Sequence, residues 1–404
     1  MNASATSDQR DSRLTIGLCL LVALLEGFDL QAAGVAAPKL APAMGLSPGV
    51  LSWFFSASTL GMFIGAFAGG WLSDRKGRKF VLVLSVALFG LCSILTGAAA
   101  TPDLLIAARF LTGVGLGGAL PNLIALVAEN SPPERKGRAV ALMYCGTPLG
   151  GAVATVVSLY TDAWQVIFHL GGVLPLVVVP LLAFLLPKSR AQAATASVAP
   201  RDGSAEALFG EGRAGRTLLL WGAFFATLLV LYLLLNWTPS LLKARGFSRT
   251  EIGVFQIVFN VAGGLSCVLI APMLDRRGGA LFTTVVYLVM GVFLALLATA
   301  SSNLWTLVPI AIGLGFGVLV AQAILYALAP KLYGVAHRGA GVGAAVSIGR
   351  LGSAVGPLLA GAMLSVGLTP SGLLLAILPI VALGGLTALV LTVRQGAATA
   401  DPVA

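Results

Sequence analysis

Twelve stretches of the chain are each long and apolar enough to cross a lipid bilayer as an α-helix, which needs about 20 such residues. Hydrophobic residues make up 58% of the 404 residues and charged residues 10%, whereas a soluble domain carries about 25% charged residues. Because no water-soluble fold could bury this much apolar surface, the sequence predicts an all-α integral membrane protein. The predicted helices cover residues 14–36, 50–72, 80–100, 104–127, 139–160, 164–186, 217–236, 250–272, 281–300, 304–329, 340–365 and 371–393.

The twelve predicted helices divide into two groups of six. Between them lies a stretch rich in Ala, Ser, Gly and charge that lacks apolar periodicity, which is typical of a flexible linker. We therefore expect five parts: an N-terminal tail (1–13), a six-helix bundle (14–186), a linker (187–216), a second six-helix bundle (217–393) and a C-terminal tail (394–404).

The two halves share sequence features at a nearly constant spacing. The tetrapeptide that begins at Asp74 recurs, slightly changed, at Asp275, 201 residues later. Because six helices is an even number, both halves would enter the membrane from the same side and form parallel repeats. Further matches at spacings of 200 or 201 residues are Gly113, Gly115 and Gly117 with Gly313, Gly315 and Gly317; Pro38 with Pro239; and Asn122 with Gln322.

The basic residues indicate the orientation of the helices. With the N-terminus inside, 19 Lys and Arg residues fall in inner segments and four in outer loops, as expected if both termini are cytoplasmic. The net charge of +10 is then a topology signal, and we expect no nucleic-acid partner. The four cysteines lack metal-ligand spacing, and the glycines of 113–118 lie within a membrane helix and not after a strand, so we expect no metal, cofactor or dinucleotide site.

Three motifs resemble those of a known family. The stretch from Gly70 to Lys79 resembles the loop 2–3 signature of the major facilitator superfamily, and residues 109–117 resemble its helix 4 signature. Residues 26–29, Glu-Gly-Phe-Asp, resemble the Asp-Gly-x-Asp pattern of its aromatic acid:proton symporters, with Glu26 where the pattern more often has Asp. The runs 14–34, 116–126 and 143–146 extend this resemblance over nearly the whole chain.

The resemblance implies a fold of two six-helix bundles and a task. We expect a monomeric protein of the bacterial inner membrane that takes up a small aromatic carboxylate with protons. The leading substrate is 3-(3-hydroxyphenyl)propionate or a related hydroxylated acid. At the inner rim, the resemblance implies a gating latch with a weaker second copy; the latch residues are Asp74, Arg75, Gly77, Arg78 and Lys79, and those of the copy are Asp275 and Arg276.

Two acids lie deep within the first predicted helix. Glu26 and Asp29 are three residues apart and share one helical face. Desolvation and mutual repulsion both favour proton binding, so the pair could load a proton on one side and release it on the other. Asp29 would lie about 10 Å below the outer end of its helix and Arg109 about 8 Å below that of helix 4, so the two could meet. Arg109 is then either a structural counter-ion or a switch.

Arg350 lies about 15 Å into the eleventh predicted helix, near the midplane. Its planar guanidinium fits a carboxylate in bidentate fashion, so we expect it to hold the substrate's carboxylate; the alternative is a salt bridge to Glu26. Ring and hydroxyl contacts would come from aromatic and amide side chains. The aromatics could instead face lipid or pack in the core, whereas buried amides in lipid need partners, and the symmetric placement of the two amides indicates a shared central cavity. The candidates are Phe28, Asn122, Tyr144, Gln322 and Tyr326.

Other functions have weaker support. Residues 146–151, Gly-Thr-Pro-Leu-Gly-Gly, predict a bend in helix 5 and are faintly similar to an antiporter signature, which keeps an exporter or exchanger as the alternative. A sensor would need an output domain, and the longest inner loop has about 30 residues, too few for one. We find no catalytic constellation typical of an enzyme.

Overall fold

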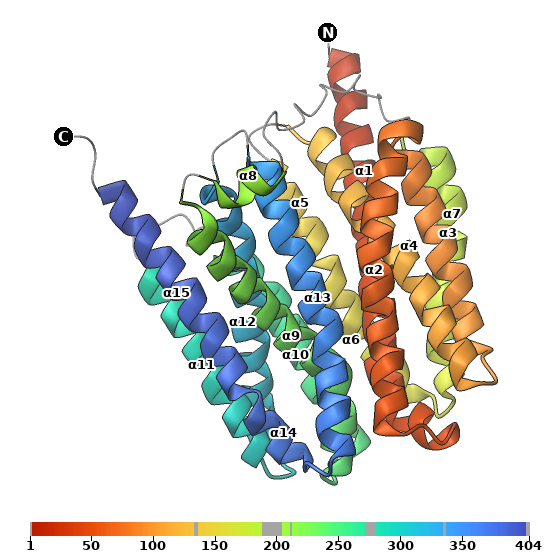
Figure 1. Ribbon diagram of the computed structural model, residues 1–404. Coiled ribbons are helices and arrows are strands. Elements are labelled where there is room, and N and C mark those ends of the chain that lie inside the picture. Colours follow the sequence, from red (N-terminus) through yellow and green to blue (C-terminus); the bar gives the residue numbers. More distant parts are fainter. Residues whose placement is uncertain are drawn as a thin grey trace. The chain divides into compact units, whose positions relative to one another are not determined.

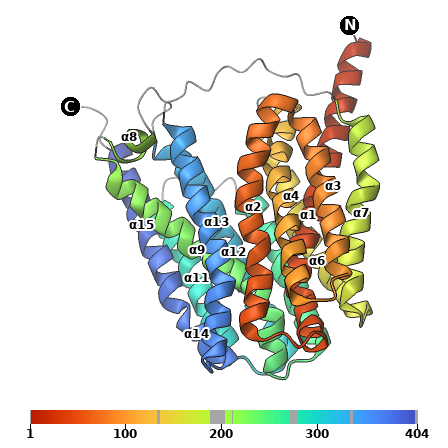
Figure 2. The same cartoon turned by 45° about the vertical axis from the view of Figure 1, so that its right-hand side comes forward.

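The computed structural model describes residues 2–132, 136–187, 204–210, 212–270, 279–333 and 337–400. The chain forms two compact units, residues 1–194 and 195–404. All regular elements within the described ranges are helices, and those of each unit run alongside one another (Figures 1 and 2).

The first unit contains the six membrane-length helices predicted for it. Helix α2 begins with a capping hydrogen bond from the Val50 amide to Ser47 Oγ at 3.3 Å and ends at Gly77, whose φ of 85° suits glycine and turns the chain into α3. The elements are α1 (Asn2–Ala43), α2 (Pro48–Lys76), α3 (Arg78–Gly97), α4 (Pro102–Glu129), α5 (Lys136–Tyr144), α6 (Gly146–Tyr160) and α7 (Trp164–Leu185).

The second unit repeats this plan. Helix α10 begins with a capping box in which the Ser248 amide donates to Glu251 Oε2 at 2.8 Å and the Glu251 amide donates to Ser248 Oγ at 3.3 Å. The elements are α8 (Ser204–Phe209), α9 (Ala214–Ala244), α10 (Arg249–Ile270), α11 (Gly279–Thr299), α12 (Leu304–Leu328), η3 (Ala329–Lys331), α13 (Arg338–Ser365), α14 (Pro370–Ala376) and α15 (Leu378–Ala400).

Eleven spans among the described residues are long and apolar enough to cross a membrane, and α10 matches the remaining prediction, 250–272. The predicted boundaries need correction at the ends. Helix α1 begins at Asn2 and α15 continues to Ala400, so both predicted tails contain helical residues. The predicted linker contains α8, and Thr217 of α9 donates to the Leu208 carbonyl at 2.8 Å.

Two predicted helices are interrupted by proline. The fifth breaks at Cys145, between α5 and α6, where Pro148 has no N–H to offer the carbonyl of Tyr144. The break adjoins residues 146–151, where the sequence predicts a bend. The last helix breaks in the same way at Ile377, two residues before Pro379, into α14 and α15.

Small residues let helices α2 and α4 approach closely. A Cβ added to Gly65 would lie 2.0 Å from the Val114 carbonyl oxygen, and one added to Gly117 would lie 2.2 Å from the Met62 carbonyl oxygen. Neither contact is sterically possible, so a larger residue would force the helices apart. Glycines at these positions therefore permit close helix packing.

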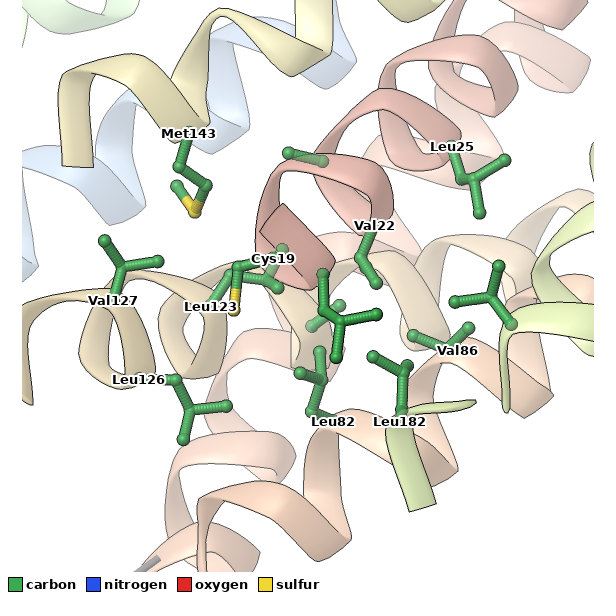
Figure 3. Packing of buried hydrophobic residues seen from close by; sticks show 14 of the residues in the cluster. Cys19, Val22, Leu25, Leu82, Val86, Leu123, Leu126, Val127, Met143 and Leu182 are labelled. Atoms are coloured by element: carbon green, nitrogen blue, oxygen red, sulfur yellow. The ribbon is translucent and has the colours of Figure 1, made fainter. Parts of the chain in front are cut away.

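A core of apolar side chains adjoins this α2–α4 packing and lies between α1, α3, α4, α5 and α7. Figure 3 shows Val22 and Leu25 of α1 directed toward Leu82 and Val86 of α3, with Leu182 of α7 beside them. Cys19, Leu123 and Met143 extend the same cluster. This core fixes the rotation of α1 and therefore the direction in which its polar residues point.

The glycine contacts define the register of the repeat. A Cβ on Gly113 would lie 2.0 Å from the Ser58 carbonyl oxygen, and one on Gly315 would lie 2.2 Å from the Phe259 carbonyl oxygen. Ser58 and Phe259 are 201 residues apart, whereas Gly113 and Gly315 are 202 apart. The same register relates a second pair of contacts, Gly115 with Phe89 and Gly317 with Met290.

The prediction that Asn122 and Gln322 are equivalent is therefore wrong. In the register of the packing contacts, Asn122 corresponds to Ile324. The ionisable residues of the membrane helices also lack counterparts: Asp29 corresponds to Val230, Arg109 to Ala311 and Arg350 to Pro148. The duplication built the scaffold, and each half carries its own chemistry.

Candidate functional site

Asp29 of α1 and Arg109 of α4 form a buried ion pair in the first unit. Asp29 Oδ2 lies 2.8 Å from Arg109 Nη1, and the two side chains are 0% and 1% exposed. Arg109 Nη2 also donates to the Asp29 backbone carbonyl at 3.2 Å. This confirms the contact predicted from helix depth. The pair lies within the interior of both helices, with Glu26 one turn away on α1 and Asp103 in the first turn of α4.

Three residues that sequence reasoning missed complete the surroundings of this pair. Ser93 of α3 donates to Asp29 Oδ1 at 2.7 Å. The guanidinium carbon of Arg109 lies 6.0 Å from the ring centroid of Phe54 on α2 and 5.7 Å from that of Phe168 on α7. The cation is thus held by one carboxylate and by the two rings. A serine and two phenylalanines are common in membrane helices, so their types gave no signal.

The other two candidates on α1 are buried beside Asp29. Glu26 lies one helical turn toward the N-terminus and is 1% exposed. Phe28 is also 1% exposed, and a Cβ on Gly171 of α7 would lie 3.2 Å from its ring. Phe28 therefore fills the space between α1 and α7. Its contacts support a packing role in the first unit.

In the second unit, the structure gathers Arg350 with three polar residues. Arg350 of α13 donates from Nη1 to the hydroxyl of Tyr232 on α9 at 3.2 Å. Tyr326 of α12 forms a side-chain hydrogen bond with Gln322 and lies within electrostatic range of Arg350 and Tyr232. Three predicted residues are therefore neighbours, and Tyr232 joins them. The ring of Phe224 packs edge-on against Tyr326 at 5.3 Å between centroids.

Asn122 and Tyr144 are placed apart from these groups. Asn122 accepts from Ser73 of α2 at 2.7 Å through Oδ1 and donates to the Gly118 carbonyl at 2.8 Å through Nδ2. Its amide therefore ties α2 to α4. Tyr144, the last residue of α5, is 38% exposed.

Further buried amides in the second unit went unnoticed in the sequence. Asn236 on α9 and Gln256 and Asn260 on α10 are each at most 4% exposed. Asn236 donates to the Tyr232 carbonyl and Asn260 to the Gln256 carbonyl, both at 2.8 Å. A sequence signal existed: polar residues four apart recur on α9, α10 and α12, which places each pair on one helical face.

The predicted latch residues at the end of α2 make mostly local contacts within the first unit. Arg78 pairs with Glu129, the last residue of α4, at 2.7 Å. Lys79 donates to the Leu186 carbonyl at the end of α7, a favourable place for a cation. Asp74 is exposed, and the Arg75 guanidinium lies 3.8 Å from the Trp71 ring centroid. The second copy, Asp275 and Arg276, lies outside the described residues.

At the opposite ends of the helices, cations cap carbonyl groups in a similar way. Lys39 of α1 donates to the carbonyls of Ser158, in the last turn of α6, and of Thr161, which follows α6, both at 2.6 Å. Arg245, which follows α9, donates to the carbonyls of Leu297 and Ala300. Partial burial lowers the pKa of the Arg245 guanidinium. These cations stabilise helix ends and are not candidates for the site.

Membrane-length helices in two units with matching internal packing, and buried charges in mid-span, define a multi-pass membrane transporter and not an enzyme. The chain belongs to the major facilitator superfamily, whose family model matches residues 19–357. This confirms the fold and the family predicted from the sequence.

Characterised relatives align along almost all of the chain. It is 43% identical to the 3-(3-hydroxy-phenyl)propionate transporter of Escherichia coli, over 97% of this chain and 98% of the relative. It is 33% identical to a 4-hydroxybenzoate transporter of Pseudomonas aeruginosa and 32% identical to the gallate transporter of Pseudomonas putida. These alignments cover 87% and 88% of this chain, respectively, and 86% of each relative.

The fold is also similar to that of a solved transporter. A bacterial homolog of the human lysosomal transporter Spinster, in an inward-facing and occupied conformation, matches with a TM-score of 0.69. It covers 95% of this chain and 94% of that one at 17% sequence identity. At this identity the likeness concerns the fold alone.

Proposed function

We propose that this protein is a proton-coupled symporter that carries a small aromatic carboxylate into the cell by alternating access. The observation that carries the proposal is the buried ion pair between Asp29 and Arg109. A charge pair within membrane helices is costly and is retained where it serves transport. We place the protein in the bacterial inner membrane with both termini cytoplasmic, because basic residues concentrate in the segments on that side.

The pair is suited to exchange a proton with the surroundings. Binding of a proton at Asp29 removes its negative charge and weakens its hold on Arg109, so the two protonation states favour different arrangements of α1 and α4. Glu26, one turn away on α1, is a second carboxylate through which a proton could pass. We therefore assign proton coupling to Glu26 and Asp29, with Arg109 as the group that responds.

The substrate's carboxylate would bind at Arg350. The guanidinium carries a full positive charge and donates a hydrogen bond to the neutral hydroxyl of Tyr232, and its planar fork matches a carboxylate. Tyr232, Tyr326 and Gln322 surround it with aromatic rings and hydrogen-bonding groups, which suits a hydroxylated aromatic acid. The relatives are named as transporters of 3-(3-hydroxy-phenyl)propionate, 4-hydroxybenzoate and gallate. All three substrates are hydroxylated aromatic acids.

Coupling would then follow from charge. Protonation of the acids on α1 and occupation of Arg350 by a carboxylate both discharge groups that are costly to enclose in lipid, so the loaded protein can change its access more easily than the half-loaded one. The latch residues at the end of α2, with Arg78 bound to Glu129, would open and close the inner side.

Uptake of labelled 3-(3-hydroxyphenyl)propionate into cells that express the chain tests this proposal. We expect accumulation that a protonophore abolishes and that other aryl carboxylates inhibit. Arg350→Gln should raise KM by about 10- to 100-fold, since a charge-assisted hydrogen bond contributes about 1.5–3 kcal/mol. Arg338→Gln, an exposed arginine at the start of the same helix, is the matched control and should be silent. Normal KM in Arg350→Gln would reject the carboxylate assignment.

A further inference from the structure

The Ser93 hydroxyl lies between two acceptors in the interior of the first unit. Its Oγ is 2.7 Å from Asp29 Oδ1 and 3.1 Å from the backbone carbonyl oxygen of Phe168 on α7. Ser93 and Asp29 are both 0% exposed. Because neither side chain has exposed surface, each can form hydrogen bonds only with other groups of the protein.

A serine hydroxyl carries one proton and can also accept a hydrogen bond. Ser93 therefore cannot donate to both oxygens at once. When Asp29 is ionised, Ser93 donates to its Oδ1. When Asp29 carries a proton on Oδ1, the carboxyl donates to Ser93 Oγ, and the Ser93 proton turns to the Phe168 carbonyl. Both states use the same heavy-atom positions, and in both every proton has an acceptor.

We propose that Ser93 is a positioning residue for proton coupling: its hydroxyl rotates between the Phe168 carbonyl and Asp29, so that Asp29 can bind or release a proton without leaving a buried group unsatisfied. The inference rests on the proposed proton coupling and adds to it. Without such a hydroxyl, one protonation state of Asp29 would lack a hydrogen-bond partner in a site closed to water, which is costly.

The surroundings of Arg109 fit the same alternation. Apart from the Asp29 carboxylate, its guanidinium contacts the Asp29 backbone carbonyl at 3.2 Å and lies 6.0 and 5.7 Å from the ring centroids of Phe54 and Phe168, and the charge of the Asp29 side chain plays no part in these contacts. Cation–π contacts in a desolvated site are worth enough to hold a cation. Arg109 therefore still has partners at the moment Asp29 is neutralised, before α1 and α4 rearrange.

Few other titratable groups of this unit face Asp29. Arg109 comes from α4 and Glu26 from α1 itself, and Cys92 on α3 lies within electrostatic range of Asp29. Tyr144 and Cys145 lie toward the N-terminal side of Asp29 along α1, since the adjacent Gly146 packs between Leu20 and Leu24. The others described on packed helices lie toward helix ends or further along the helix. They are Arg13, Cys19 and Lys39 on α1, Asp74, Arg75 and Lys76 on α2, Arg78 and Lys79 on α3, Asp103 and Glu129 on α4, Lys136 and Arg138 on α5, Tyr160 on α6, and His169 on α7, which packs at Gly97.

Purified protein in liposomes can test the inference. Two rates are measured across a range of external pH: uphill uptake of 3-(3-hydroxyphenyl)propionate driven by a proton gradient, and counterflow exchange at equal pH. We expect Ser93→Ala to keep exchange within about threefold of wild type. The midpoint of its uphill pH profile should rise by about one pH unit, because the lost bond to the ionised carboxylate is stronger than the lost bond to the neutral one.

Two control variants separate this effect from simple packing. Ser93→Thr keeps the hydroxyl and should keep the wild-type profile, whereas Ser85→Ala removes a buried serine of the same helix and should not move the midpoint. If Ser93→Ala is not recovered as folded protein, Ser93→Cys replaces it, and its weaker hydrogen bond should shift the midpoint in the same direction.

The outcomes are distinct. An unchanged midpoint in Ser93→Ala or Ser93→Cys, with or without a uniform loss of rate, would overturn the role of Ser93 and leave the symport proposal standing. If wild-type uptake ignores the proton gradient, the symport proposal itself fails, and the inference about Ser93 fails with it.

Discussion

Removal of either charge of the Asp29–Arg109 pair should cost much more stability than removal of both. The pair has a 2.8 Å contact and almost no exposed surface, which is the situation in which breaking a pair from one side costs about 3–5 kcal/mol. Asp29→Asn leaves the cation with the Asp29 carbonyl and two ring faces, so we expect a loss near about 3 kcal/mol. Arg109→Gln leaves a carboxylate whose remaining donor in the described structure is Ser93, and we expect about 4–5 kcal/mol.

The double variant Asp29→Asn/Arg109→Gln places two neutral amides side by side and should cost only about 1–2 kcal/mol. The coupling between the sites would then be about 5–7 kcal/mol. Unfolding by SDS in mixed micelles, followed by tryptophan fluorescence, measures the three free energies. Asp103→Asn, which removes an exposed acid from the first turn of α4, is the control and should cost less than about 1 kcal/mol. A double variant as unstable as the sum of the two single variants would refute the view that each charge exists to balance the other.

Three further predictions concern packing, capping and substrate contacts. Gly65→Ala should destabilise the protein by about 1–3 kcal/mol in the same unfolding assay, because its Cβ would meet an α4 carbonyl oxygen at 2.0 Å. The control Gly70→Ala has open space around its Cβ and should not destabilise the protein. Equal losses of stability in the two variants would argue against tight α2–α4 packing. Glu251→Ala should cost about 1 kcal/mol by removal of the capping box, and no change in unfolding would show that α10 begins without it. Asn122→Ala should lower stability by about 1–2 kcal/mol but leave KM within twofold, whereas Gln322→Ala should raise KM; a reversed pattern would restore Asn122 to the substrate site.

The ion pair could be predicted because helix length and rise fix the depth of a residue in the membrane. Asp29 and Arg109 are charged, so their cost in lipid marks them, and their depths agree. Ser93, Phe54 and Phe168 could not be predicted in the same way. Their types are ordinary in membrane helices, and their contacts depend on how α2, α3 and α7 are rotated, which depth does not determine.

The equivalence of Asn122 and Gln322 failed for a physical reason that the sequence hides. Glycines at every second position, as in residues 113–117, match themselves when shifted by two, so sequence comparison cannot choose between spacings of 200 and 202 residues. The choice is made by which carbonyls the glycines contact, as Gly113 and Gly315 show. Arg350 was found by its charge, whereas its partner Tyr232 became evident only from the contact between α9 and α13.

The helical content of the linker and the tails was not predicted because a helix outside the membrane-length spans need not have a long apolar run. Residues 204–209 are helical and connect to α9 through Thr217, although hydropathy shows no span there. The helical continuation of α1 to Asn2 is likewise polar and invisible to a search for membrane helices.

Proton movement that accompanies substrate entry is the most direct measure of the central claim. Wild-type protein is placed in liposomes that contain a trapped pH indicator, with equal pH inside and outside, and 3-(3-hydroxyphenyl)propionate is added; protein-free vesicles account for passive entry of the uncharged acid. We predict an internal acidification above that background in step with labelled substrate, and none from Asp29→Asn. Substrate entry through the wild-type protein without a matching proton signal would contradict the account.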